Sequence, residues 1–427
     1  MHFLYLVFGA AALCAQPLPA AAQSTAQSSH DRALAPSTTG APFTLEQALA
    51  KALAANPGLR AAALDVAVAD GARRQAGLLP NPELSFVREG TQRGTRTQTL
   101  QLSQVLELGG KRSARIQLAD TERSLAAGQL ELARTDLRAD VSAAYFDALA
   151  AQERVELAQA SLDVAQGAAR AAAKRVAAGR VSPVEEDRAG LALASSRMEL
   201  AGARSALSVA LHRLAAWWGD AKPVPALLVM PERDPAPLPP FEELARALGA
   251  SARLRQASLQ VAREEAQVGV DRAQRMPDLT VIVGSKKEDE IGRPQTVLGL
   301  SVPLPLFNRN GGALQASLAR AEQARARLEA ERLRLHQELG AAYQRAQLAR
   351  EQVRSMRDEI LPASRRVFDA TVTGFEAGKF GFLDVLDAQR TLLQIRTQYI
   401  ETLHERYRAL ADLGRHTGTL QDNRISP

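Results

Sequence analysis

Apolar residues along this 427-residue chain follow two periods, which alternate and then recur in the second half. A helical period begins at Phe43-Thr44-Leu45, where Thr44 is suited to capping a helix, and it ends at Pro80-Asn81-Pro82, because prolines cannot continue a helical hydrogen-bond ladder. An equivalent run begins at Phe241-Glu242-Glu243-Leu244 and ends near Pro277. This recurrence predicts that the chain contains two copies of one structural unit.

After each proline stop the apolar period changes to two, which is the period of a β-strand. The alternating apolar positions are Leu84, Phe86, Leu100, Leu102 and Leu106 in the first half, and Leu279, Val281, Val283, Leu298, Leu300, Val302 and Leu304 in the second. Polar loops at Gly90–Gly94 and Lys286–Arg293 separate the strands of each pair. The alternation therefore predicts one antiparallel strand pair in each half, at about residues 83–106 and 278–304.

Two interpretations of these strand pairs remain open from the pattern alone. They are either surface hairpins packed on helices or parts of a transmembrane barrel, whose strands have this alternation and this approximate length. One chain supplies only four strands, and an open sheet edge in lipid leaves backbone groups unsatisfied. If the strands span a membrane, several copies of the chain must close the barrel.

The longest helical patterns follow the strand pairs, from Lys111 to about Ala178 and from Leu314 to about Glu376. At a rise of 1.5 Å per residue, each would reach roughly 90 to 100 Å. Apolar residues recur at intervals of seven, a spacing that predicts coiled-coil packing. They are Leu118, Leu125 and Leu132, Leu328 and Leu335, and Leu386, Leu393, Ile400 and Tyr407. A solvated periplasmic coiled coil without a channel is the alternative interpretation.

Each long helix is expected to end in a hairpin tip, at about residues 178–183 and 377–383. Gly179 lies in VAAGRVSPVEEDR and Gly378 in FEAGKFGFLDVLDAQR, 199 positions later. The two structural repeats then extend over residues 43–219 and 241–418. Between them, residues 220–240 contain seven prolines and are predicted to be a linker outside the helices.

The N-terminus has the pattern of an export signal, with an apolar run at Phe3–Leu13 and the small-residue site Ala20-Ala21-Ala22. We therefore expect a signal peptide at residues 1–22, a disordered leader at 23–42 and a disordered tail at 419–427. The only cysteine, Cys14, lies within the signal, and its lipidation is an alternative. If Cys14 is removed with the signal peptide, the mature chain has no cysteine and therefore no disulfide and no thiolate metal site.

Composition and charge narrow the function classes. The net charge of +6 and the pI near 9.7 could indicate a nucleic-acid partner. The basic residues alternate with acidic ones along helices instead of forming a block, so no nucleic-acid partner is predicted. The sequence has no Gly-rich phosphate loop, nucleophile elbow or spaced set of histidine and carboxylate, so neither an enzyme nor a cofactor is predicted. The six histidines form no close ligand pair and the five methionines do not cluster, so no metal site is predicted.

Several motifs, in order and at doubled spacing, resemble the TolC-like outer-membrane efflux protein family. They are LEQALAKALAANP, PNPEL, VLELGGKR at 105–112, VPLPLFNRNGG at 302–312 and GFLDVLDAQRTLLQ at 381–394. The resemblance covers residues 43–418. It implies a mostly α-helical fold with a transmembrane β-barrel: a homotrimer with a twelve-stranded barrel in outer-membrane lipid and an α-helical tunnel in the periplasm of a Gram-negative bacterium.

The ELGGKR and LFNRN motifs are most similar to the branch that exports heavy-metal cations, of the cobalt-zinc-cadmium or copper-silver type. This similarity implies a passive conduit that receives its substrate from a periplasmic adaptor protein and a proton-driven inner-membrane pump. Export of drugs or other small organic molecules is the alternative for the same channel. A periplasmic adaptor or soluble coiled-coil protein fits less well, because an adaptor would have a single hairpin flanked by β-rich sequence.

The resemblance also assigns roles at the two tips. It implies that Gly179, Arg180, Ser182, Gly378 and Lys379 meet the adaptor. Read locally, Ser182-Pro183-Val184-Glu185 fits a capping box that simply starts the returning helix.

The family likewise implies that Asp384 and Asp387 face the narrow end of the tunnel. From this position we expect three copies to form a cation-selective constriction. As isolated residues, the two carboxylates would only favour the start of a helix. Family members often have tyrosine at the position of Phe375 and arginine at that of Phe380. Both departures put in doubt the polar contacts that hold the closed tip together. Lys379 and Arg390 are the candidates to replace these contacts.

Overall fold

The computed structural model describes residues 42–90, 92, 94–224, 227–230, 238–377 and 379–417. Contacts divide the chain into Met1–Thr39 and Gly40–Pro427, and every described residue belongs to the second unit. The expected signal peptide with Cys14, the tail, and all but the last residue of the expected leader lie outside the described residues. So do Gly378 and part of the expected linker.

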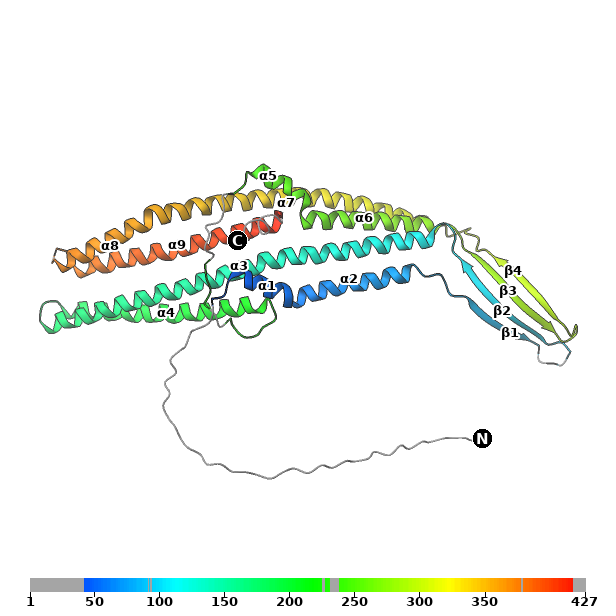
Figure 1. The fold of residues 1–427 in the computed structure, drawn as a ribbon, viewed down its shortest axis with the longest axis horizontal. Coiled ribbons are helices and arrows are strands. Elements are labelled where there is room, and N and C mark those ends of the chain that lie inside the picture. The colour runs from blue at the N-terminus through cyan, green and yellow to red at the C-terminus, as the bar shows by residue number, and fades with distance from the viewer. Residues whose placement is uncertain are drawn as a thin grey trace, which may run out of the picture. The chain divides into compact units, whose positions relative to one another are not determined.

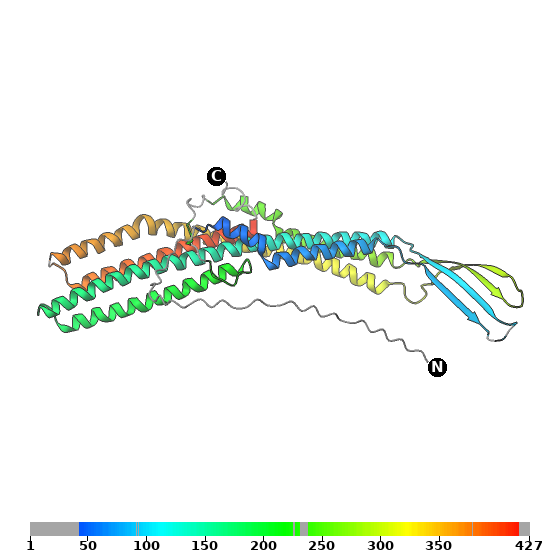
Figure 2. The same cartoon turned by 60° about the horizontal axis from the view of Figure 1, so that its bottom comes forward.

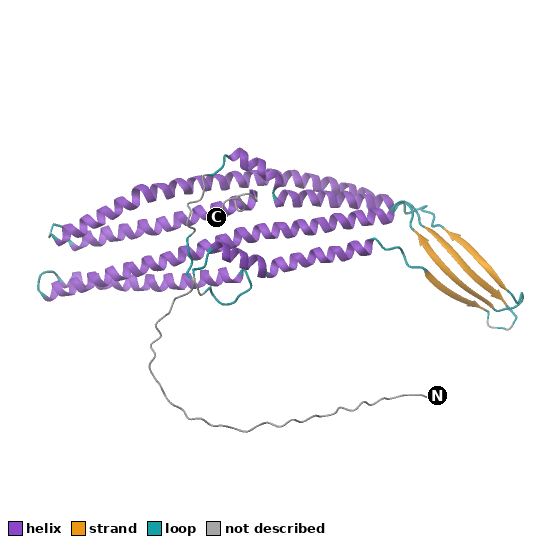
Figure 3. Ribbon diagram, in the orientation of Figure 1, coloured by secondary structure: helices purple, strands orange, loops and turns teal. Residues whose placement is uncertain are grey.

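The second unit contains the same series of elements twice (Figures 1 and 3). In the first half these are α1 (Leu45–Ala55), α2 (Pro57–Ala76), β1 (Glu83–Glu89), β2 (Thr97–Leu106), α3 (Lys111–Ala177) and α4 (Pro183–Ala216). In the second half they are α5 (Phe241–Ala247), the short 3-10 helix η1 (Leu248–Ala250), α6 (Ala252–Ala273), β3 (Leu279–Glu288), β4 (Pro294–Ser301), α7 (Gly311–Ser355), the π-helix η2 (Met356–Ile360), α8 (Leu361–Glu376) and α9 (Phe382–Thr417). The hairpin tips and the sheet lie at opposite ends of these helices (Figures 1 and 2).

Side-chain caps begin several of these helices. Thr44 and Gln47 form a complete capping box at α1, and the Asn56 side chain accepts the amide of Leu59 at 2.9 Å, with Pro57 in the first turn of α2. No helix among the described residues combines the length and apolarity needed to cross a membrane.

The joins from sheet to long helix explain the ELGGKR and LFNRN motifs. Gly109 and Gly110 have φ values of 67° and 74°, and Asn310 has a φ of 54°. Glycine and asparagine adopt this left-handed conformation most readily. A Cβ on Gly109 would also lie 2.5 Å from the Cβ of Met276, so the close approach of the two halves needs glycine at this position. The motifs therefore encode backbone turns at equivalent points of the two repeats.

The four strands form one antiparallel sheet in the order β1-β2-β3-β4. The predicted pairs β1–β2 and β3–β4 are confirmed, and the central β2–β3 pair joins the two halves. The register places Leu84 opposite Leu102, Leu102 opposite Val283, and Val283 opposite Leu298. Because side chains alternate along a strand, one face of the sheet carries an apolar band and the other is mainly polar.

Two strand boundaries differ from the alternation pattern. β3 continues through Lys286–Glu288, which were assigned to the loop, because these residues pair with Thr97–Thr99 of β2. β4 ends at Ser301, although the expected apolar face extended to Val302 and Leu304. Pro303 and Pro305 interrupt the segment that follows, and proline has no amide hydrogen to donate to a ladder.

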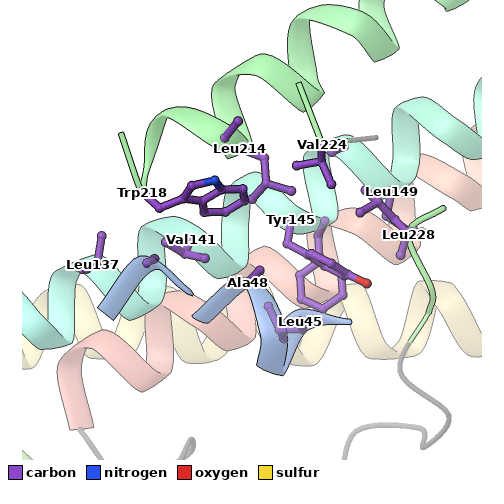
Figure 4. Close-up of a cluster of buried hydrophobic side chains, with 14 of the residues drawn as sticks. Leu45, Ala48, Leu137, Val141, Tyr145, Leu149, Leu214, Trp218, Val224 and Leu228 are labelled. Carbon is purple, nitrogen blue, oxygen red and sulfur yellow. The ribbon is translucent and has the colours of Figure 1, made fainter. Parts of the chain in front are cut away.

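A buried apolar cluster lies where α1, α3 and α4 meet, midway along the helices (Figure 4). Its centre is Tyr145, which is fully buried; the hydroxyl lies 2.6 Å from the carbonyl oxygen of Val229 and 2.8 Å from that of Phe43. Burial raises the pKa of Tyr145 to about 12. Residues 227–230 of the expected linker are not helical, and Leu228, which is only 2% exposed, packs within this cluster.

Charged residues connect the halves near the end of α9. Arg253 of α6 and Arg415 of α9 lie 3.4 and 3.5 Å from the carboxylate of Asp136 on α3, and Arg415 also pairs with Asp140. The four side chains are partly buried. Removing one partner would leave the others desolvated and incompletely neutralised, so this group helps to hold the second repeat against α3.

The lowered pKa of His416, next to this group on α9, leads to a prediction of how the stability of the protein depends on pH. Burial disfavours the imidazolium and lowers the pKa of His416, although the Glu338 carboxylate 4.0 Å away opposes the shift. A histidine in the unfolded chain binds its proton near about pH 6.5, so the unfolded state gains more protons as pH falls and stability decreases below that pH. His416→Gln should therefore flatten the decline in melting temperature between about pH 7 and pH 5. Thermal denaturation of the purified protein at several pH values measures this effect.

The exposed His212 provides the matched control. His212→Gln should leave the pH dependence unchanged. An equal effect of the two substitutions would exclude His416 as the source.

Candidate functional site

The first hairpin tip is a helix C-cap of the Schellman type. Gly179 has a φ of 65°, its amide donates to the carbonyl of Val176 at 2.9 Å, and the amide of Arg180 donates to the carbonyl of Arg175 at 2.9 Å. This pair of bonds requires a left-handed residue at Gly179. The side chain of Arg180 is consequently exposed at the end of the hairpin.

Of these two hydrogen bonds, the one that spans five residues recurs in the second tip, 199 positions later. The amide of Lys379 donates to the carbonyl of Gly374 at 2.8 Å, as Arg180 does to Arg175. Lys379 is exposed, so both tips present a cation at the same point of the turn. Gly378, which the sequence analysis assigned to the docking surface, lies outside the described residues.

The predicted capping box at Ser182 is replaced by a simple N-cap. The Ser182 hydroxyl accepts the amide of Val184 at 3.4 Å, whereas a capping box would use the amide and side chain of Glu185. One half of a capping box is present in the second tip, where the Asp384 carboxylate accepts the amide of Gly381 at 2.7 Å. Asp384 is the repeat equivalent of Glu185, so the two copies begin their returning helices with different caps.

Asp384 and Asp387 line an open groove between α8 and α9, with a volume of about 640 Å³. Both side chains are exposed. Asp384 also makes the contact at the start of α9. The remaining lining is apolar or hydroxyl-bearing, apart from one further carboxylate: Glu359, Ile360, Ala363, Ser364, Val367, Thr371, Ala388, Thr391 and Ile395.

Glu359 is the residue of this groove that sequence reasoning missed. It belongs to η2, the π-helix that separates α7 from α8. Pro362 lies two residues after the end of η2 and has no amide hydrogen to donate, and a π-turn accommodates such an interruption without ending the helix. Pro362 in an otherwise proline-free run was the available signal, but it does not reveal which side chain the altered turn brings to the groove.

The structure shows no metal centre in the part of the chain that it describes, where no group of three or more histidine, cysteine or carboxylate residues is close enough to hold an ion. The groove therefore carries dispersed negative charge instead of a chelating site.

The departures at Phe375 and Phe380 both have packing partners. The guanidinium of Arg175, at the end of α3, lies 4.2 Å from the centre of the Phe375 ring on α8. Both side chains are half-buried, which strengthens a cation–π contact. The Phe380 ring lies against Gly374, where an added Cβ would come within 2.2 Å of it. An arginine on one hairpin thus contacts an aromatic ring on the other, a pairing that the sequence analysis did not find.

Comparisons with known proteins agree with this architecture. The profile described as Outer membrane efflux protein matches residues 48–220 and 244–419, one segment in each half. The chain is 40% identical to the cobalt-zinc-cadmium resistance protein CzcC of Cupriavidus metallidurans, over 98% of this chain and 100% of that protein. It is 29% identical to the nickel and cobalt resistance protein CnrC of the same organism, over 67% of this chain and 68% of CnrC.

Solved structures agree on the fold. The crystal structure of CusC, whose published description concerns transmembrane channel formation, aligns with a TM-score of 0.73 at 18% identity. The alignment covers 87% of this chain and 91% of CusC. The predicted resemblance, including its heavy-metal branch, is confirmed. The doubled profile match and the near-complete alignment with CzcC together place this chain in the outer membrane efflux protein family.

Proposed function

We propose that three copies of this chain form an outer-membrane channel that carries divalent heavy-metal cations out of the periplasm. The observation that carries the substrate is the 40% identity to a cobalt-zinc-cadmium resistance protein over nearly the whole chain. Weaker matches to a nickel and cobalt resistance protein point to the same class of ion. Cobalt, zinc, cadmium and nickel share a double positive charge, which is the property a passive conduit can use.

The sheet supports assembly from several copies. β1 and β4 are the outer strands of the four-stranded order, so each has one edge without a partner among the described residues. Such edges are satisfied when β4 of one copy pairs with β1 of the next, and twelve strands from three copies close a barrel. The apolar band then faces lipid and the polar face lines the lumen.

The tips support docking to a periplasmic adaptor. Arg180 and Lys379 are exposed in turns that contain the same backbone hydrogen bond. Ser182, the N-cap residue of α4, is also exposed. A trimer presents six tips, three of each kind, to the adaptor. The adaptor in turn connects the channel to an inner-membrane pump, which supplies the energy that a passive conduit lacks.

The carboxylates of the α8–α9 groove support cation selectivity. In a trimer, Asp384 and Asp387 from three copies would form a ring of six negative charges at the narrow end of the tunnel. The apolar and hydroxyl lining of the groove offers no compensating cation among its residues. A ring of this kind raises the local concentration of cations and lowers that of anions.

A complementation experiment tests this function. The full chain is expressed in cells that have a metal-exporting pump and adaptor but lack the outer-membrane channel. Restored tolerance to zinc, cobalt and cadmium, with lower accumulated metal, is the expected result. Restoration only with the pump and adaptor of a drug exporter would retain the channel and reject the metal substrate. A monomer recovered from the soluble periplasmic fraction would reject the channel itself.

A further inference from the structure

Basic residues continue the apolar face of the sheet beyond its apolar band. The register places Arg88 opposite Gln98, and Gln98 opposite Lys287. Gln98 is two residues from Leu100, so this row lies on the apolar face. The ladder continues for one more residue, because the amide of Asp289 donates to the carbonyl of Arg96 at 3.0 Å. Arg96 therefore lies on the same face, one step closer to the turns.

The three cations on this face lack neutralising partners. In the described part of the chain, no carboxylate makes an ion pair with Arg88, Arg96 or Lys287, and the buried Nε of Arg96 has no hydrogen-bond partner. Asp289 follows on the same face without coming within ion-pair distance of them.

The opposite face of the same strands shows the contrast. Lys286 pairs there with Glu288, and the register places Glu89 and Glu288 on either side of Thr97. On the polar face a carboxylate thus pairs with Lys286, whereas Asp289, on the face that would meet lipid, forms no ion pair with the three cations.

The position of these cations identifies the ligand, on the basis of the proposed membrane barrel. The turns of the sheet lie at the end opposite the helices (Figure 1), so in a barrel with a periplasmic tunnel they reach the outer leaflet. Arg88 and Lys287 are two strands apart, which corresponds to roughly 10 Å. Basic side chains at this level, directly above an apolar band, bind the phosphates of lipid whose acyl chains lie on that band.

We propose that Arg88, Arg96 and Lys287 form a binding site for the phosphorylated headgroup of an outer-leaflet lipid. A free anion would not need the adjoining apolar band, whereas a lipid uses both parts of the surface. Arginine binds phosphate through two parallel N–H groups, and Lys287 adds a point charge at the far side of the site. The site anchors the outer end of the barrel without taking part in transport.

Lipid binding to the full-length trimer in phosphatidylcholine nanodiscs tests the site. The probes are lipid A with two phosphates and the same lipid with both phosphates removed. A basic residue near an anionic surface contributes about fivefold in affinity, so Lys287→Gln should weaken binding of the phosphorylated lipid about fivefold. By the same reasoning, the triple Arg88→Gln, Arg96→Gln and Lys287→Gln variant should lose up to about 100-fold. Binding of the dephosphorylated lipid should stay unchanged.

Lys286→Gln is the matched control, because it removes the same charge from the adjacent position on the opposite face. Its effect should stay below about twofold; an effect equal to that of Lys287→Gln would overturn the site. Binding of the triple variant at the wild-type level would also overturn it. Displacement of the lipid by an equal concentration of inorganic phosphate would assign the cations to a free anion instead.

Two observations distinguish failure of the lipid site from failure of the proposed channel function. If the triple variant does not assemble, the single Arg88→Gln and Lys287→Gln variants carry the test, each with its own expected fivefold loss. Trimers that conduct ions but show no phosphate preference would overturn the lipid site and leave the proposed function intact. Failure of the wild-type chain to insert into a bilayer would overturn both.

Discussion

Replacing both Asp384 and Asp387 with asparagine is expected to remove most of the channel's preference for cations. A cleft lined by charge of one sign changes local ion concentrations by about tenfold or more, so the cation-to-anion permeability ratio should fall by about that factor. Single-channel recordings in asymmetric potassium chloride measure the ratio from the reversal potential. An unchanged ratio would reject the constriction.

Asparagine is the appropriate replacement because of the contact at the helix start. The Asp384 carboxylate accepts the amide of Gly381, and an asparagine side chain keeps a carbonyl oxygen for the same bond. The substitution therefore removes charge while preserving the start of α9. Glu185→Gln is the matched control, since Glu185 occupies the equivalent position of the first repeat and lies outside the groove. Its ratio should remain at the wild-type value.

Replacing Phe375 with leucine is expected to increase the fraction of time for which the channel is open. We propose that the Arg175–Phe375 contact holds the two hairpins of one copy together in the closed tip. Cation–π contacts contribute about 1 kcal/mol when partly buried, so three copies contribute about 3 kcal/mol, or about 100-fold in the ratio of closed to open channels. Leucine retains an apolar side chain of related size and removes the aromatic face. Open probability in planar bilayers is the measurement.

Three further variants separate the ring contact from general packing. Phe375→Tyr keeps the aromatic face and should stay closed. Arg175→Ala should open the channel as Phe375→Leu does. The double variant should open little more than either single variant, because the two substitutions remove the same interaction. Lys174→Ala removes a neighbouring exposed cation and should have no effect. Equal opening by Phe375→Tyr and Phe375→Leu would contradict the latch.

The contact also shows what the sequence analysis could and could not say about the closed tip. Phe375 and Phe380 were identified as departures from the family, and Lys379 or Arg390 were suggested as substitutes for the lost polar partners. The structure pairs Phe375 with Arg175, 200 positions earlier in the chain. No local pattern connects these two residues, because their contact depends on how one hairpin lies against the other.

Much of the architecture was accessible because it is encoded locally and twice. Proline stops, left-handed turn residues and the change of apolar period occur at equivalent points in both halves, and each has a short-range physical cause. The repeat then supported assignments that a single copy would leave ambiguous. The two strand pairs and the family were predicted correctly for this reason.

The tertiary structure decided which of the contacts that the sequence allows are formed. Ser182 and Asp384 cap the starts of the two returning helices through different contacts, and Glu359 reaches the groove through a π-turn. Lys286 and Lys287 are adjacent and chemically identical, yet in the described residues Lys286 alone of the two has a carboxylate partner, because side chains alternate along β3 and Glu288 shares the face of Lys286. Periodicity specifies which residues share a face, whereas the register between strands and the packing between hairpins determine which charges are neutralised and which remain available.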